Sequence, residues 1–209
     1  MSIDNPFTQQ DYKIIERKVL YQGVFTLVRL TLQHRLFDGT WSEQIQRELL
    51  ERRSAAAILP YDPVLDRVIL IEQFRPGSFA DPQSPWLIEI PAGVLGKNEQ
   101  PNEVAHREAI EEANCHISHL TPICEYFVSP GGTDEYLNLY CGKVDSRDIK
   151  GVHGLKNEHE DIRVINIPTD EAIAKFYAGQ IKTSPAIIAL LWLQSHRKQL
   201  QEEWQSGNR

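Results

Sequence analysis

The sequence predicts an α+β protein in which helices flank a mostly β core. From Ile14 to Leu50, apolar and polar residues alternate with a period of two, which is typical of half-buried strands. Further along, short apolar runs separated by turn-forming residues indicate buried strands. Three segments have the pattern of helices, and they begin at Pro101, Thr169 and Ser184.

The first predicted domain, residues 1–52, is a small antiparallel sheet. Val24 to Leu32 alternates as a strand, Asp38-Gly39 is the strongest hairpin signal in the chain, and Ser42 to Leu50 fits a partner strand. About fifty residues bury little core on their own, so we expect this sheet to pack on something else.

Residues 53–209 form the second predicted domain, with buried strands first and a long helix at its end. Its predicted strands are 54–60, 68–73, 86–91, 135–144 and 161–167. A short helix over 169–179 is expected to begin with a Thr-Asp cap, and a long helix runs from Ser184 to about Trp204. Trp86 and Trp192 lie in apolar runs and are expected in the core.

The helix predicted after Pro101 carries a cluster of carboxylates. Proline suits the first position of a helix, and Asn114 tolerates the left-handed conformation that ends many helices. At about 100° per residue, Glu108, Glu111 and Glu112 fall on one face. Beside them, alanines at 105, 109 and 113 form a stripe that allows close packing.

Like charges on one helix face repel, so we expect a positive group beside these glutamates. Arg107 lies four residues before Glu111 and is placed to form an ion pair with it. Clustered carboxylate oxygens favour Mg²⁺ or Mn²⁺ over zinc, which prefers imidazole or thiolate ligands. The alternative is an acidic helix face that is simply exposed to solvent.

Composition limits the other function classes. A net charge of −7 argues against non-specific nucleic-acid binding. The three cysteines have no CxxC spacing and are expected to be reduced thiols. The N-terminus lacks a signal-peptide pattern and no apolar run is long enough to span a membrane, so we expect a cytoplasmic protein with no membrane partner.

The spacing of the carboxylate segment resembles the signature of the Nudix hydrolase family, G-x5-E-x7-R-E-x2-E-E. The six matching residues are Gly93, Glu99, Arg107, Glu108, Glu111 and Glu112. Two nearby positions depart from the usual family pattern: Asn114 replaces a glycine, and Ala109 replaces a larger aliphatic residue. Neither departure removes a carboxylate.

Within that family, the chain is similar to the ADP-ribose pyrophosphatases of bacterial type. The similarity includes Ile90-Pro91-Ala92-Gly93 and the later segment Ser129-Pro130-Gly131-Gly132. It implies an α/β/α sandwich with a mixed sheet. It also implies Mg²⁺-dependent cleavage of ADP-ribose, or other ADP-sugars, to AMP and a sugar phosphate, and a homodimer that exchanges its N-terminal sheets.

The resemblance also implies roles for individual residues. Glu108, Glu112 and the Ala92 carbonyl are expected as metal ligands, with Glu111 as a ligand or a brace, while Arg107 and Glu99 orient the helix and its loop. Glu158 in the acidic loop 157–161 is the expected base and Glu160 an additional metal contact. In that loop, His159 is the alternative base and a charged surface turn is the non-catalytic interpretation. The expected substrate contacts are Arg47, Arg75, Phe25, Gly93, Pro130 and Gly131.

Several alternatives stay open. Arg75 is otherwise expected in a surface ion pair and Phe25 in the core. The function nearest to the expected one is hydrolysis of another nucleotide sugar or a dinucleotide. From a different class, a non-catalytic sensor of ADP-ribose and a purely structural domain remain, although the latter leaves the clustered acids unexplained.

Overall fold

The computed structural model describes residues 7–206 and divides into two units. The first unit runs to Arg53 and also includes Phe127–Glu135, and the second contains Ser54–Tyr126 and Tyr136–Arg209. Each unit has its own sheet. Within residues 7–206, no helix is both long enough and apolar enough to cross a membrane.

The sheet of the first unit has three antiparallel strands in the order β1, β2, β3. They are β1 (Tyr12–Gln22), β2 (Thr26–His34) and β3 (Ile45–Glu51). The predicted hairpin between the last two strands is confirmed, with Gly39 at a φ of 85° in the connecting loop. The strand before it, β1, extends the alternating pattern towards the N-terminus.

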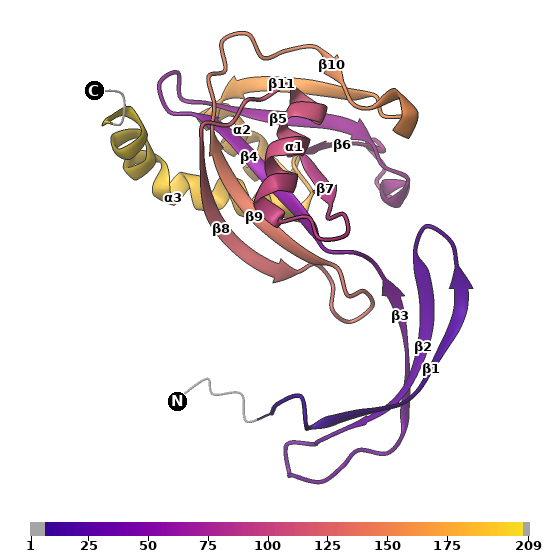
Figure 1. Cartoon of the computed structure of the whole chain (residues 1–209). Helices are drawn as coiled ribbons and strands as arrows, with labels where there is room; N and C mark the ends of the chain where they lie inside the picture. Colours follow the sequence, from indigo (N-terminus) through magenta and orange to yellow (C-terminus); the bar gives the residue numbers. More distant parts are fainter. Residues whose placement is uncertain (1–6, 207–209) are drawn as a thin grey trace. The chain divides into compact units, whose positions relative to one another are not determined.

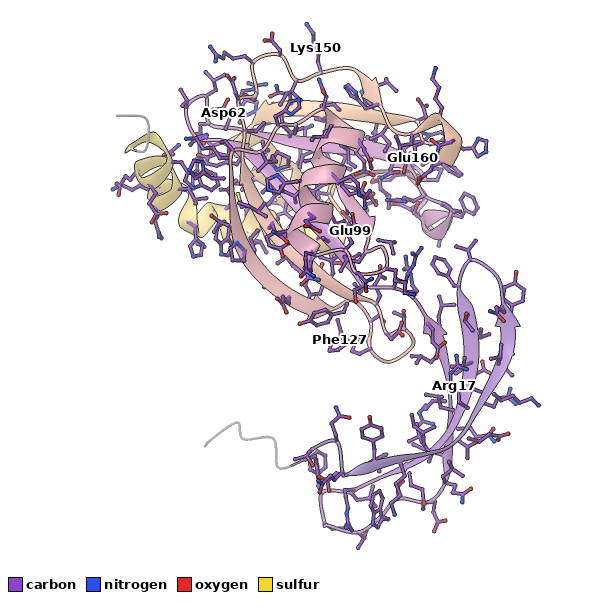
Figure 2. The ribbon with its side chains drawn as sticks, viewed as in Figure 1. Arg17, Asp62, Glu99, Phe127, Lys150 and Glu160 are labelled. Carbon is purple, nitrogen blue, oxygen red and sulfur yellow. The ribbon has the colours of Figure 1, made fainter. Side chains whose placement is uncertain are left out.

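This small sheet buries little of its own surface. Every residue of β1 is exposed, and side chains project from both faces of the sheet (Figure 2). Among the described residues of this unit, the side chain of Val28 is fully buried. The expectation that the sheet is too small to form a core of its own is therefore confirmed.

The second unit is built on a mixed sheet with the order β10-β11-β5-β4-β9-β8, to which β6 adds beside β5 and β7 beside β4. The strands β4 and β9 are parallel, whereas β4 with β5 and β5 with β11 are antiparallel. The strands are β4 (Ala55–Asp62), β5 (Arg67–Phe74), β6 (Trp86–Glu89), β7 (Ala92–Val94), β8 (His119–Phe127), β9 (Tyr136–Lys143), β10 (Val152–His153) and β11 (Ile162–Pro168).

Helices cover both faces of this sheet, which confirms the predicted α+β sandwich (Figure 1). All of β4 is buried, and its side chains alternate between the two cores: Leu59 packs with α2 (Thr169–Tyr177) and α3 (Ser184–Ser206), and Ile58 with α1 (Pro101–Ala113). This alternation follows from the opposite directions of successive side chains along a strand. The cysteines are free thiols, as expected.

Two predictions about this unit were wrong. Trp86 is 52% exposed, and it packs edge-on against Phe74 instead of entering the core. The short helix α2 has Pro168 at its N-cap, and proline has no side-chain group that could cap it. The predicted Thr-Asp cap is absent, and the hydroxyl of Thr169, the first helical residue, donates to the Asp66 carbonyl. Trp192, by contrast, packs partly buried against the core.

Candidate active site

Helix α1 has well-defined ends that fix the position of its carboxylates. Pro101 is its first residue, and the side chains and backbones of Gln100 and Glu103 bond reciprocally in a capping box. Asn114 adopts the left-handed conformation at a φ of 51° and its N–H donates to the Ile110 carbonyl. The predicted helix and both of its ends are confirmed.

The alanine stripe brings α1 close to the sheet. Ala105, Ala109 and Ala113 are fully buried. As a result, two of the glutamates are also enclosed: Glu108 is 8% exposed and Glu112 is 2% exposed. Acidic side chains are rarely this buried unless they have a partner, so both carboxylates need a compensating group.

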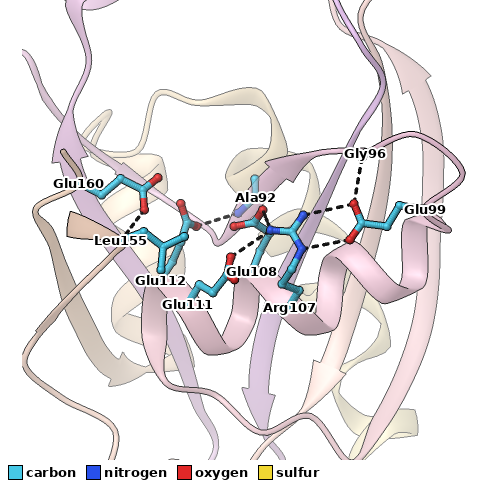
Figure 3. Close-up of polar contacts among 9 residues, drawn as sticks. All are labelled: Ala92, Gly96, Glu99, Arg107, Glu108, Glu111, Glu112, Leu155 and Glu160. Atoms are coloured by element: carbon cyan, nitrogen blue, oxygen red, sulfur yellow. Dashed lines mark hydrogen bonds and ion pairs between the residues drawn. The ribbon is translucent and has the colours of Figure 1, made fainter. Parts of the chain in front are cut away.

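Arg107 compensates three of the acids. Its guanidinium lies 3.0 Å from Glu99, 2.7 Å from Glu108 and 2.9 Å from Glu111 (Figure 3). Glu99 in turn accepts the Gly96 N–H, and its hydrogen bond with Arg107 is the main reason that its pKa is lowered. The predicted ion pair between Arg107 and Glu111 is present, and Arg107 also pairs with Glu99. That Arg107 and Glu99 orient the helix and its loop stays a prediction.

Glu112 forms no ion pair of this kind with any residue between 7 and 206. Its carboxylate accepts the Ala92 N–H at 2.9 Å. Burial is the main cause that raises its pKa well above the ordinary value, the charges of Glu108 and Glu160 add to this, and Arg75 opposes it. Burial likewise raises the pKa of Glu108, against the effect of Arg107. A buried carboxylate with one backbone donor is a favourable place for a cation.

The donor set fits a hard divalent cation. In an extended strand the N–H and C=O of one residue point to the same side, so the Ala92 carbonyl lies on the side of Glu112. Within residues 7–206, no three His, Cys, Asp or Glu side chains form a complete metal-binding group. Mg²⁺ does not require one, because it keeps several waters and commonly uses one or two carboxylates with substrate phosphates.

Gly93 is required for the position of Glu108. A Cβ atom added at residue 93 would lie 1.6 Å from Glu108 Oε1. We expect Gly93→Ala to displace this carboxylate and to lower both metal affinity and kcat/KM by roughly 10- to 100-fold. Gly77→Ala, where an added Cβ meets nothing within 4 Å, is the matched control. Calorimetric metal titration of both variants tests this, and unchanged affinity in Gly93→Ala would contradict it.

The raised carboxyl pKa values predict a pH effect on the metal-free protein. Folding favours the protonated form of Glu112, so its stabilising contribution is complete below about pH 4.5 and is lost as pH rises through the higher folded-state pKa. Glu112→Gln cannot ionise. We therefore expect the melting temperature of Glu112→Gln in EDTA, relative to that of the wild type, to increase as the pH is raised from 5 to 8. A constant difference across that range would contradict the raised pKa.

The acidic loop borders the same site. A 3₁₀ turn, Lys156–Glu158, is followed by His159 at a φ of 57°. Glu160 accepts the Leu155 N–H at 2.9 Å, and the N–H of Gly154 donates to the Glu111 carbonyl of α1. Figure 3 shows the side chains as a row along the helix, from Glu99 at its N-terminal end to Glu160 beyond Glu112. Glu158 is exposed.

Arg75 is also near this row. It forms the ion pair expected from the alternative interpretation, with Glu89 at 2.9 Å, and Glu112 and Glu160 both favour its charge. Glu89 is not among the predicted site residues, because the run that contains it has the pattern of a buried strand. The signal was present, since Glu89 is the lone acid in the apolar run that starts at Trp86.

The other predicted substrate residues belong to the first unit. Phe25 is 39% exposed and lies 4.7 Å from the guanidinium carbon of Arg52, so the alternative that placed it in the core was wrong. Arg47 lies on β3 and is exposed. Pro130 and Gly131 lie in the exposed loop whose Gly132 carbonyl accepts the Leu50 N–H. Their binding of substrate stays a prediction.

Comparison with known proteins adds sequence and fold relationships to this geometry. Residues 51–187 match the NUDIX domain model. The chain is 42% identical over 198 residues to an ADP-ribose pyrophosphatase of Escherichia coli K12, covering 95% of each chain. A Haemophilus influenzae ADP-ribose pyrophosphatase is 43% identical over 207 residues, covering 98% of this chain and 95% of the relative.

More distant matches agree with these. A GDP-mannose pyrophosphatase of Escherichia coli SMS-3-5 is 31% identical over 188 residues, covering 89% of this chain and 96% of that protein. The crystal structure of an ADP compounds hydrolase superimposes with a TM-score of 0.68 at 19% identity, covering 94% of this chain and 98% of the other. The structural match supports the fold.

Proposed function

The chain belongs to the Nudix family, and on that premise we propose that it hydrolyses the pyrophosphate of ADP-ribose to AMP and ribose 5-phosphate. The observation that carries the proposal is the enclosed carboxylate of Glu112, which lies on the family's motif helix and forms no ion pair with any residue that the structure describes. Relatives over nearly the whole chain are ADP-ribose pyrophosphatases, which supports the choice of substrate.

Divalent-metal dependence is general among these hydrolases, and for this chain we propose Mg²⁺, with Mn²⁺ as the alternative. Such an ion polarises phosphate oxygens and lowers the pKa of bound water. Glu108, Glu112 and the Ala92 carbonyl would hold it. Arg107 keeps Glu108 and Glu111 in place, and Arg75 offers a guanidinium to the diphosphate or terminal ribose.

The acidic loop supplies the proposed proton acceptor. Glu158 would take the proton from the attacking water, and Glu160 would be a further residue to hold the metal ion when the loop closes. Closure also excludes bulk water from the diphosphate. The hydrogen bond from the Gly154 N–H to the Glu111 carbonyl holds the start of this loop beside the carboxylates of α1.

We propose a homodimer in which residues 1–52 pair with the other subunit and help form the adenine site, while residues 53–209 are the hydrolase domain. The exposed apolar side chains of β1, among them Ile14, Val19 and Tyr21, support this, because a three-stranded sheet rarely stays uncovered on both faces. Arg47 and Phe25 would stack on adenine. Sedimentation as a monomer would contradict the exchange.

The free thiols are consistent with a reducing compartment, which supports a cytoplasmic protein. A second candidate substrate is a different nucleotide sugar, which the GDP-mannose pyrophosphatase relative favours. A non-catalytic sensor is less compatible with intact carboxylates at positions 108, 111 and 112.

Product analysis tests the proposal. ADP-ribose is incubated with the protein in Mg²⁺ or in EDTA, and the products are separated by anion-exchange chromatography. The expected result is equal amounts of AMP and ribose 5-phosphate in Mg²⁺ and neither product in EDTA. Binding of ADP-ribose without cleavage would instead indicate a sensor.

A further inference from the structure

A compact group of polar side chains lies at the junction of β5 and β6, outside the motif helix. Glu89 is its centre, with its side chain 14% exposed. Arg75 Nε lies 3.1 Å and Arg75 Nη2 lies 2.9 Å from Glu89 Oε2, and Gln73 Nε2 donates to the same oxygen at 3.0 Å. The Glu89 carboxylate thus receives hydrogen bonds from Gln73, which lies on β5, and from Arg75, which follows β5 directly.

This geometry determines which edge of the guanidinium is available. Glu89 takes the edge formed by Nε and Nη2, which is the edge that commonly binds an anion side-on. Within residues 7–206, the guanidinium makes no other hydrogen bond to a side chain, so both protons of Nη1 and the second proton of Nη2 stay available. Arg75 can therefore receive a second anion at its end.

The local backbone keeps this group together. Gln73 pairs with Leu87 and Phe74 with Trp86 in the antiparallel ladder of β5 and β6. The N–H of Arg75 donates to the Pro85 carbonyl, which closes the loop between the two strands. Glu89 is therefore fixed relative to the start of the Arg75 side chain, and the ion pair limits the remaining rotamers.

We propose that Glu89 is a positioning residue, which holds the side edge of Arg75 so that its Nη1 end faces the diphosphate of the substrate. This inference rests on the proposed function, because it assigns the anion at Arg75 to a nucleotide-sugar diphosphate. A guanidinium fixed before binding loses less conformational freedom when the substrate arrives. Glu89 contacts neither the metal ligands nor the substrate in this account.

The first test uses Glu89→Gln and Glu89→Ala, assayed with ADP-ribose and Mg²⁺. Release of Arg75 is expected to lower kcat/KM by about 30- to 100-fold in the alanine variant, mainly through a higher KM, because the substrate's negative charge is already present in the ground state. The glutamine variant should fall between it and the wild type. A lower kcat with an unchanged KM would overturn the positioning role.

Glu72→Gln is the matched control. Glu72 is the neighbour of Gln73 on β5 and pairs with Arg163 on the adjacent strand. Its replacement removes the same charge from the strand next to that of Glu89 without touching Arg75, so activity near that of the wild type is expected. If Glu72→Gln matched the loss in Glu89→Gln, a general charge effect would replace the proposed role.

A double-mutant cycle separates positioning from direct contact. In an Arg75→Ala background, Glu89→Ala should lower kcat/KM by less than about twofold, because the side chain that it positions is gone. A further tenfold loss in that background would show that Glu89 acts on metal or substrate itself and would overturn the inference.

A readout without substrate distinguishes this inference from the proposed function. The Nε–H signal of Arg75, identified by its loss in Arg75→Lys, should exchange with water at least about tenfold faster in Glu89→Gln than in the wild type. Equal exchange would overturn the inference even in an active enzyme. The two results can also differ, with slow exchange of the Nε–H in the wild type and fast exchange in Glu89→Gln while the protein does not cleave ADP-ribose. That outcome would reject the proposed function but would keep the contact by which Glu89 holds Arg75.

Discussion

Glu112→Gln is expected to lower kcat for ADP-ribose by roughly a thousandfold while the fold is retained. The carboxylate is enclosed and accepts the Ala92 N–H, so its position is fixed before a cation binds. Glutamine has the same shape and keeps an oxygen for that N–H, but it lacks the negative charge that would hold a divalent cation. Steady-state kinetics at saturating Mg²⁺, together with circular dichroism, measures both parts of the prediction.

Glu103→Gln is the control for this variant. Glu103 lies on the same helix, but its carboxylate accepts the Gln100 N–H in the capping box and is exposed. We expect near wild-type kcat and a small loss of stability, since glutamine also serves in a capping box. Near-normal activity in Glu112→Gln would remove this residue from the proposed metal ligands.

The second large effect is expected for Glu158→Gln. Removal of a general base commonly costs about 10²- to 10⁴-fold in rate, and we expect kcat to fall within that range. Metal affinity should change little, because the expected ligands are on α1 and β7. The decrease of kcat/KM at low pH, which reports protonation of the base in the free enzyme, should disappear in the variant.

Asp161→Asn is the matched control, because Asp161 is an exposed acid of the same loop with no assigned role. Its kinetics should resemble those of the wild type. The opposite result for Glu158→Gln, with metal binding abolished and the pH profile unchanged, would make Glu158 a metal ligand and place the base elsewhere.

The part of the site on α1 was accessible from sequence because its determinants are local. Pro101, Asn114 and the spacing of the glutamates specify a helix, its ends and its acidic face within a short stretch. The two departures from the family pattern also have local explanations. Asn114 adopts the required left-handed conformation, and Ala109 is fully buried in the close packing of α1.

The contacts between distant segments were not accessible in the same way. The pairing of Arg75 with Glu89 depends on the register of β5 and β6, and the anchor between Gly154 and Glu111 depends on where the acidic loop crosses α1. Periodicity reports which residues are apolar, but it does not determine strand partners. The same limit explains why Trp86 was placed in the core, although the strand that carries it leaves its side chain exposed.

A comparison of kcat/KM for ADP-ribose and GDP-mannose, each with Mg²⁺ and with EDTA, tests the central claim most directly. We expect kcat/KM for the cleavage of ADP-ribose to AMP to be at least about tenfold higher than kcat/KM for GDP-mannose, and we expect EDTA to abolish both reactions. Preference for GDP-mannose would contradict the proposed substrate. Full activity in EDTA would contradict the proposed role of the carboxylates on α1.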